Sequence, residues 1–402
     1  MPERQRRGSR PTGVAHRCSS ADNGRVNEAL LRDAAERWGT PLYVTDLDAA
    51  GTGARAWRDA LPGALVAYAV KANPDPALLR RLADEGCGFE VVGPIELALA
   101  RRAGAIPERI VVNGVGQTDA DLADALAAGA LVNAETLGAL DALLRAGSGR
   151  IGLRINPALD AETHPHLATG AATSKFGIAL ADVSEAVRRL RSAGRTLASI
   201  GAHIGSDIGE LEVFVRLSGL LRELGDRTGA ERIDLGGGYR GDPSRYAAAV
   251  GRELREPRRL IVEPGRSIVG GAGWLLTRVV RVQSRGHLVA DAGMTELLRP
   301  MLYGARHPVH LLARGGPLDG DERWTLAGPI CEAGDLLADG LELGPGAGEG
   351  ALLAIGEVGA YGLAMASSYN GRLGPAQVVL EGGIARLSRR RETWEDVIAR
   401  DA

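Results

Sequence analysis

The sequence predicts an α/β protein in which a (β/α)8 barrel is followed by a C-terminal domain rich in β-strands. Two observations lead to this prediction. About eight short apolar runs alternate with Ala/Leu/Arg-rich stretches of helical period as far as about His287, and after Trp274 strand-like runs separated by Gly, Pro and Asp take over. Repeated strand and helix units form a parallel sheet, and eight of them can close into a barrel.

The predicted barrel strands end in polar residues or glycine. The strands cover residues 64–70, 89–92, 110–113, 131–133, 151–156, 199–203, 233–235 and 259–263. The residues at or just after their ends are Lys71, Asn113, Asn133, Asn156, His203, Gly236 and Glu263. Such a rim suits a ligand site at the C-terminal face of a barrel, although each residue alone could be a strand-end cap or a turn residue.

The β-rich domain is predicted from runs at residues 279–283, 287–291, 352–355 and 377–380, and residues 41–45 can join its sheet. We therefore divide the chain into a disordered basic tail at residues 1–26, a barrel at residues 46–285, and a β-rich domain of residues 27–45 plus 286–402. A transit peptide is the competing interpretation of the tail, which lacks the amphipathic periodicity of such peptides.

Composition narrows the classes of function. With 402 residues, 45% hydrophobic content and a formal net charge of -2, the chain can bury a large core but has no charge excess to attract nucleic acid or an anionic membrane. No apolar stretch approaches the roughly 20 residues of a membrane span. Cys18, Cys87 and Cys331 show neither metal-like nor paired spacing, so we expect no metal site and a reducing, cytoplasmic location.

Lysine is scarce in this chain. Only Lys71 and Lys175 are lysine among the 48 lysine and arginine residues. Arginine stays protonated, whereas a lysine amine can lose its proton and bond to a carbonyl carbon, so a retained lysine is a candidate for covalent chemistry. Lys71 closes a predicted buried strand, before the turn at Asn73-Pro74, which makes it the better candidate; the alternative is an ordinary surface lysine at a strand end.

Three predicted rim loops can hold a phosphate. Gly236-Gly-Gly238 follows a strand directly, and backbone amides without a Cβ can approach an anion closely. Glu263-Pro-Gly-Arg266 and His203-Ile-Gly-Ser206 follow two other strands. A single glycine triplet is more often a flexible turn, but three such loops together with an isolated lysine on an early strand are a more specific pattern.

With these motifs the chain resembles the pyridoxal-phosphate-dependent decarboxylases of the alanine-racemase-like fold, most closely the diaminopimelate decarboxylases. The resemblance covers about residues 40–396. The motifs that carry it are Tyr68-Ala-Val-Lys-Ala-Asn73, Asn156-Pro157, Ser174-Lys-Phe-Gly177, His203-Ile-Gly-Ser206, Gly236-Gly-Gly238, Glu263-Pro-Gly-Arg266, Asp291-Ala-Gly-Met294, Leu298-Arg-Pro-Met-Leu-Tyr303, His307-Pro308, Gly328-Pro-Ile-Cys-Glu332 and Ala360-Tyr-Gly362. Asp207 and Ala333 depart from the family pattern, which usually has Gln and Ser there.

The resemblance implies pyridoxal 5'-phosphate as the cofactor and assigns roles to individual residues. Lys71 would carry the cofactor, Glu263 would keep its ring nitrogen protonated, and His203 would stack on its ring. The remaining cofactor contacts implied are Ser206, Gly237, Gly238, Pro264, Gly265, Arg266 and Tyr361. Taken alone, a histidine or tyrosine at such positions is more often a core residue.

The implied substrate is meso-2,6-diaminopimelate, and the implied products are L-lysine and carbon dioxide. Arg266 and Arg299 can each bind a carboxylate in a bidentate manner, with the hydroxyls of Tyr303 and Tyr361 beside them. Glu332 would bind the distal ammonium. The resemblance further implies that Cys331 donates a proton and, with Glu332, comes from the neighbouring subunit of a homodimer with shared active sites. In isolation, Cys331 reads as a buried apolar filler.

Three alternatives stay open at this point. The same chemistry could act on lysine, ornithine or a specialised biosynthetic intermediate. A racemase shares the barrel and the lysine, but we expect it to lack Cys331-Glu332 and the Arg299 to Tyr303 motif. A binding or regulatory protein of this fold would usually have lost the lysine or a phosphate loop, and this chain keeps both.

Overall fold

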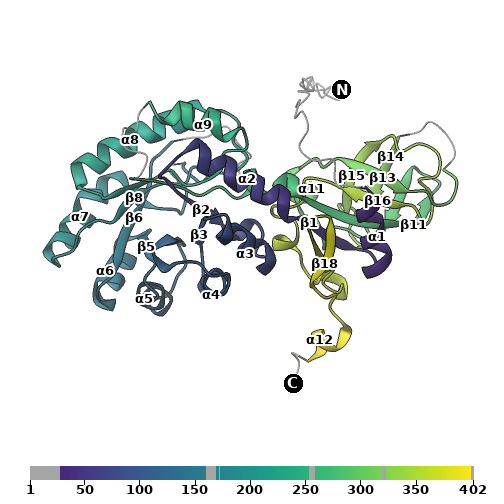
Figure 1. Cartoon of the computed structure of the whole chain (residues 1–402), viewed down its shortest axis with the longest axis horizontal. Coiled ribbons are helices and arrows are strands. Elements are labelled where there is room, and N and C mark those ends of the chain that lie inside the picture. Colours follow the sequence, from purple (N-terminus) through teal and green to yellow (C-terminus); the bar gives the residue numbers. More distant parts are fainter. Residues whose placement is uncertain (1–27, 160–168, 172, 253–258, 319–322, 400–402) are drawn as a thin grey trace, which may run out of the picture.

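Two sheets organise the chain, whose computed structural model describes residues 28–159, 169–171, 173–252, 259–318 and 323–399. One sheet closes into a barrel and the other forms a second lobe beside it (Figure 1). The predicted tail, with Cys18, lies outside the described residues. In the described residues no helix is both long and apolar enough to cross a bilayer.

The barrel sheet confirms the predicted fold class. Its eight parallel strands follow the order β5-β4-β3-β2-β10-β9-β8-β6, and pairing of β5 with β6 closes the ring. Each strand overlaps one of the eight predicted runs. The strands are β2 (Leu65–Ala69), β3 (Gly88–Val91), β4 (Ile110–Val112), β5 (Leu131–Ala134), β6 (Arg150–Asn156), β8 (Ser199–Gly201), β9 (Arg232–Asp234) and β10 (Leu260–Val262), with the short β7 (Ile178–Ala179) on the edge of β6.

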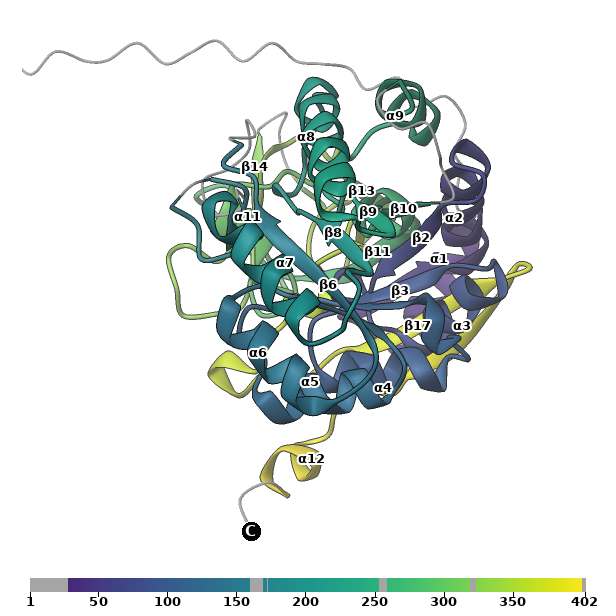
Figure 2. The ribbon, with the colours of Figure 1, turned by 90° about the vertical axis from the view of Figure 1, so that its left-hand side faces the viewer.

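Helices surround the barrel strands (Figure 2). They are α2 (Leu47–Ala60), α3 (Pro76–Asp84), α4 (Pro94–Arg102), α5 (Asp119–Ala127), α6 (Leu137–Ala146), α7 (Val183–Ser192), α8 (Glu212–Thr228), α9 (Pro243–Val250) and α10 (Arg266–Val269). Local chemistry sets several of their starts. Asp75 accepts hydrogen bonds from the amides of Ala77 and Leu78 with Pro76 in the first turn of α3, and Thr118 forms a capping box with Asp121 in α5.

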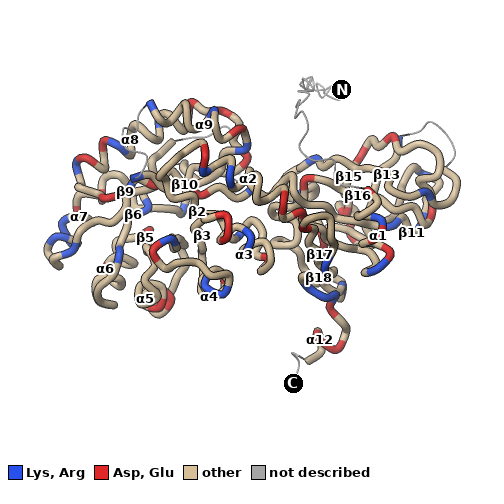
Figure 3. Tube along the Cα trace, viewed as in Figure 1, with Lys and Arg blue, Asp and Glu red and all other residues tan. Residues whose placement is uncertain are grey.

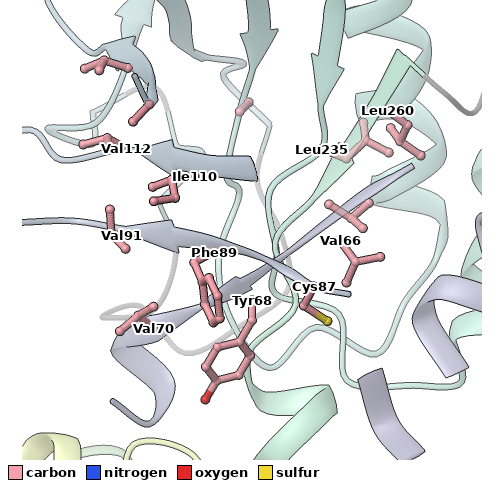
Figure 4. Close-up of a cluster of buried hydrophobic side chains, with 14 of the residues drawn as sticks. Val66, Tyr68, Val70, Cys87, Phe89, Val91, Ile110, Val112, Leu235 and Leu260 are labelled. Atoms are coloured by element: carbon pink, nitrogen blue, oxygen red, sulfur yellow. The ribbon is translucent and has the colours of Figure 1, made fainter. Parts of the chain in front are cut away.

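The layer between the barrel strands and the helices around them is a continuous apolar core. Tyr68 and Phe89 are fully buried and meet edge to face, with ring centroids 6.5 Å apart. Figure 4 shows them beside Val66, Val91 and Ile110, all projecting from neighbouring strands. All five residues of β2 are buried, as expected of a parallel strand covered on both faces, so the backbone that leads to Lys71 is held rigidly.

The second sheet contains β1 and every strand after β10. Its members are β1 (Leu42–Asp46), β11 (Gly273–Gln283), β12 (His287–Ala290), β13 (Val309–Ala313), β14 (Trp324–Ala327), β15 (Leu336–Leu341), β16 (Leu352–Ile355), β17 (Ala376–Glu381) and β18 (Ile384–Arg389). Its helices are α1 (Glu28–Trp38), α11 (Arg299–Tyr303) and α12 (Trp394–Ile398). As predicted, residues 41–45 join it, because β1 pairs with β11 and β17.

The chain passes from the barrel sheet to the second sheet before residue 285, where the boundary between them was predicted. β11 begins at Gly273 and pairs with β1, β12 and β16, so all of it belongs to the second sheet. Only its second half, residues 279–283, was predicted as a strand of the β-rich domain. Its first half is buried from Leu275 to Thr277, and such an apolar run resembles a barrel strand. The division of the chain into separate domains stays a prediction.

Candidate active site

The C-terminal ends of the barrel strands meet around a small cavity. Lys71 lies in a single 3₁₀ turn, Val70–Ala72, directly after β2. Side chains and backbone from four barrel loops or strand ends, together with Tyr361 of the second lobe, surround the cavity. The residues that line this cavity are Ala69, Lys71, His203, Ser206, Gly238, Tyr239, Glu263, Gly265, Arg266 and Tyr361. Most of the predicted cofactor-binding residues therefore meet in one place.

Lys71 forms an ion pair with a buried acid that the sequence did not reveal. Its Nζ contacts Oε2 of Glu90, whose side chain is 1% exposed, whereas the Lys71 side chain is 32% exposed. Burial by itself would lower the pKa of Lys71, but its electrostatic interactions, with Glu90 first and then with Tyr361 and Glu263, outweigh burial and raise that pKa above its ordinary value. The free amine is therefore protonated at neutral pH, with Glu90 in position to accept its proton.

Glu263 belongs to a hydrogen-bonded acidic cluster beneath the cavity. Asn113 Nδ2 donates to Glu263 Oε1 at 2.7 Å and lies 3.3 Å from Glu90 Oε1. Asn133 Nδ2 in turn donates to Asn113 Oδ1 at 2.9 Å. Burial, followed by the charges of Asp234 and Glu90, raises the pKa of Glu263 well above its usual range. A buried carboxyl group of this kind is suited to share a proton with a basic ring nitrogen.

His203 is neutral and its tautomer is defined. Burial, with the charges of Lys71 and Arg154, lowers its pKa well below the ordinary value. Its Nδ1 accepts a hydrogen bond from the Gly237 amide at 3.0 Å, which places the ring proton on Nε2. A neutral aromatic ring held in this way can stack against a flat cofactor.

The glycine loop needs glycine for steric reasons. A Cβ on Gly237 would lie 2.2 Å from the Glu263 carbonyl oxygen, and one on Gly238, at φ +102°, would lie 2.2 Å from the Gly205 carbonyl oxygen. The loops that begin at His203, Gly236 and Glu263 therefore touch backbone to backbone. Pro264 takes part as well, because its carbonyl accepts from the Ala69 amide at 3.1 Å. Exposed amides in such a close junction can bind a phosphate.

Two arginines lie beside the cavity with unused hydrogen-bond donors. The guanidinium carbon of Arg266 is 5.0 Å from the ring centroid of Tyr361, and that of Arg299 is 5.4 Å from Tyr303 and 6.0 Å from Tyr361. Within the described chain, Nε and Nη2 of Arg266 and Nε of Arg299 are buried without a hydrogen-bond partner. Burial and the nearby Arg266 lower the pKa of Arg299 to about 10. Such a pair is strongly suited to an anion.

Cys331 and Glu332 are not among the residues that line this cavity in the described chain. They lie on an exposed loop after β14, where Asn370 Nδ2 donates to Cys331 Sγ at 3.0 Å and the Tyr369 hydroxyl donates to Glu332 Oε1 at 2.8 Å. Asp335 anchors the same loop through the amide of Ile330 at 2.8 Å. Within a single chain, Cys331 and Glu332 are therefore held in place by hydrogen bonds but do not line the cavity of Lys71.

Sequence reasoning missed several residues of the site. Glu90 is hidden within an apolar strand, and its one available signal is an acid in the middle of a run that is otherwise buried. Tyr369 and Asn370 lie beyond the last recognised motif, and nothing in their local pattern connects them with Cys331. Asp234, which ends the strand before the glycine triplet, was given no role from the sequence, yet it is buried beside Glu263.

The fold and the site are those expected of a barrel enzyme that uses pyridoxal phosphate as its cofactor. Lys71, a buried acid for the ring nitrogen, a flat neutral histidine and a glycine cradle all fit that cofactor. The family model described as "Pyridoxal-dependent decarboxylase, pyridoxal binding domain" matches residues 51–270.

Curated relatives and solved structures extend the match over nearly the whole chain. A diaminopimelate decarboxylase of Deinococcus radiodurans is 43% identical over 93% of this chain and 99% of its own length, and one of Pseudomonas aeruginosa is 40% identical over 91% and 93%. The crystal structure of diaminopimelate decarboxylase from Helicobacter pylori complexed with L-lysine has a TM-score of 0.87 and 30% identity, covering 92% of this chain and 99% of that one. The chain belongs to the pyridoxal-dependent decarboxylase family, in the group of the diaminopimelate decarboxylases.

Proposed function

We propose that this enzyme decarboxylates meso-2,6-diaminopimelate to L-lysine and carbon dioxide with pyridoxal 5'-phosphate as cofactor. The observation that carries the proposal is the pair of buried arginines, Arg266 and Arg299, with unused donors beside the Lys71 cavity. A decarboxylase for a simple diamine precursor has no second carboxylate to bind. A substrate with an amino-acid group at each end does, and the curated relatives are named for such a substrate.

The lining of the cavity supports the predicted cofactor contacts. Lys71 would bond to the cofactor aldehyde, Glu263 would pair with the ring nitrogen, and His203 would stack on the ring. Ser206, Gly237, Gly238 and Tyr361 would hold the phosphate, and Pro264, Gly265 and Arg266 are the remaining predicted cofactor contacts. When bound, pyridoxal phosphate supplies an electron-poor ring that accepts the electron pair left behind by departing carbon dioxide.

The chain's own residues control the protons. The Lys71 amine must be neutral before it can bond to a carbonyl carbon, and Glu90 lies in contact to accept its proton. Glu263 would keep a proton at the ring nitrogen by pairing with it as a carboxylate, and the positive charge of the ring would offset the burial that raises the pKa of Glu263 in the absence of such a partner.

At the distal end of the substrate, Arg266 and Arg299 bind the second carboxylate, and Tyr303 and Tyr361 border it. Glu332 is assigned to the distal ammonium, and Cys331 is assigned to return a proton to Cα after the carboxylate leaves. These roles require both residues to reach the cavity.

We assign Cys331 and Glu332 to the active site of a second copy in a homodimer. Their exposed position outside the Lys71 cavity supports this assignment. Mixing inactive Lys71→Ala and Cys331→Ala variants under conditions of subunit exchange should restore activity. Half of randomly formed dimers are mixed and each has one intact site of two, so about a quarter of wild-type activity is expected. No recovery despite proven exchange would contradict shared sites.

The deciding experiment is carbon dioxide release by the cofactor-loaded protein with meso-diaminopimelate. L-lysine, L-ornithine and D-lysine serve as parallel substrates. Rapid release from diaminopimelate with L-lysine as product supports the proposal. Cofactor binding without turnover of diaminopimelate would contradict it and favour the same chemistry on another amino acid.

As part of the same proposal, the unpaired cysteine pattern, with Cys87 buried as a free thiol, supports a cytoplasmic location.

A further inference from the structure

A third charged side chain, Asp207, lies beside the arginine pair. Its Oδ1 is 4.0 Å from Arg266 Nε and 3.6 Å from Nη1 of Arg240, and about a third of its side chain, 36%, is exposed. The Arg240 side chain is 59% exposed, so water largely screens its charge. Asp207 also interacts with Arg299. Burial and the nearby Arg266 lower the pKa of Arg299, and Asp207 opposes that shift. Both buried arginines therefore experience the same carboxylate.

The position of Asp207 is set by the backbone. It occupies the left-handed region at φ +65°, which aspartate adopts more readily than most residues. The next residue, Ile208, makes two backbone hydrogen bonds. Its amide donates to the Gly238 carbonyl at 2.9 Å, and its carbonyl accepts from the Arg240 amide at 3.1 Å. The carboxylate is therefore a fixed feature of the rim and does not depend on a freely moving loop.

Asp207 balances charge without using the arginine donors. At 4.0 Å it contributes attraction to Arg266, but this distance is too long for a hydrogen bond. Within the described residues, Nε and Nη2 of Arg266 keep their hydrogen-bonding capacity. A ligand carboxylate can thus bind the guanidinium while Asp207 remains close by, and the two negative charges then repel each other.

We propose that Asp207 is a specificity-determining residue that weakens binding of the substrate's distal carboxylate to Arg266 and Arg299. It leaves the two arginines with one net positive charge, which matches a single carboxylate. Because L-lysine retains the carboxylate of that end, the same repulsion speeds its release. This inference rests on the proposed function, since it takes the arginine pair as the distal carboxylate site.

The test compares Asp207→Asn with a matched control, Glu210→Gln, in the cofactor-loaded enzyme. Glu210 is exposed on the same loop, so its substitution removes one negative charge without changing the arginine pair. Calorimetric titration measures the Kd of L-lysine and of 1,5-diaminopentane, which differ by one carboxylate. Steady-state kinetics measure the KM for meso-diaminopimelate.

Asp207→Asn should lower both the L-lysine Kd and the diaminopimelate KM by between about two- and five-fold, the range of a partly exposed ion pair. The Kd of 1,5-diaminopentane should stay the same, and Glu210→Gln should change neither value. Unchanged or weaker L-lysine binding in Asp207→Asn would overturn the inference, as would an equal change for the diamine or an equal effect of Glu210→Gln.

The two ligands also separate this inference from the proposed function. If the wild-type enzyme binds L-lysine but does not decarboxylate diaminopimelate, the proposed function fails while the Kd ratio still decides the role of Asp207. If the wild-type enzyme does not bind L-lysine, the arginine pair is no carboxylate site and the inference fails as well.

Discussion

Replacing Lys71 tests both the chemistry and the electrostatics of the site. Lys71→Ala removes the cation in contact with Glu90, a carboxylate that is 1% exposed and whose Oε1 has one polar neighbour 3.3 Å away, Asn113 Nδ2. Breaking a fully buried ion pair costs about 3–5 kcal/mol. Because the Lys71 side chain is 32% exposed, water replaces part of the lost interaction, and we expect a loss of about 1–3 kcal/mol in the cofactor-free protein at pH 8.

The dependence of this loss on pH follows from the sign of the pKa shift. The pKa of Lys71 is raised above its unfolded value of 10.5, so the stabilisation is fully present below that pH and disappears only as the pH rises through the higher folded value. In the wild-type protein the ion pair is therefore intact across the neutral range.

The assay is urea denaturation of the cofactor-free proteins, followed by circular dichroism at pH 8, with Lys71→Arg as the matched control. Arginine retains the positive charge but cannot bond covalently to the cofactor, so it should preserve more stability than alanine while abolishing carbon dioxide release equally. Equal destabilisation of the two variants at pH 8 would refute the electrostatic reasoning. An active Lys71→Ala enzyme would refute the catalytic role.

Three further predictions address other residues. Arg299→Ala should raise the KM for diaminopimelate by about 30- to 150-fold, since a substrate carboxylate loses its charged partner, and should change pyridoxal phosphate affinity by less than about twofold in equilibrium dialysis; similar losses of both would show that Arg299 does not serve the substrate. Burial raises the pKa of Asp234 to about 6, above its unfolded value of 3.8, so its contribution to stability is present below pH 3.8 and is lost as the pH rises through 6. Cofactor-free Asp234→Asn should therefore be more stable than wild type at pH 8, by about 1–3 kcal/mol in urea denaturation, and nearly equal at pH 4; a constant difference would contradict this assignment. Asn370→Ala should slow alkylation of Cys331 by iodoacetamide at pH 7, measured in a Cys18→Ser background, because it removes the hydrogen bond that orients the sulfur; an unchanged rate would mean that the 3.0 Å contact has no effect on the thiol.

The barrel was predictable because its strands are buried on both faces. Such strands appear as short continuous apolar runs, and all eight runs correspond to strands of the closed sheet. The second sheet was harder to delimit. β13, β14, β15 and β18 are partly exposed and irregular. Register shifts occur where β13 pairs with β16, β14 with β15, and β18 with β17, and they obscure the period of two.

The site was predictable where local sequence has a chemical meaning. Lys71 was identified by the rarity of lysine, and the loops at Gly236 and Glu263 by glycine directly after a strand. Glu90 was missed because a single acid in an apolar run looks the same whether it faces a ligand, a cation or another strand. Its meaning depends on Lys71, 19 residues away, which only the pairing of β2 with β3 brings into contact.

The sequence by itself determined the fold class, the lysine, the glycine cradle and the membership of the decarboxylase family, because each is written in consecutive residues or in a repeated pattern. The tertiary structure alone decided which charges meet. It placed Glu90 against Lys71, Glu263 beside Asp234 and Asp207 beside Arg266, and it kept Cys331 outside the cavity of its own chain. Electrostatic interactions depend on distance and burial in space, and a linear sequence contains neither until the barrel closes.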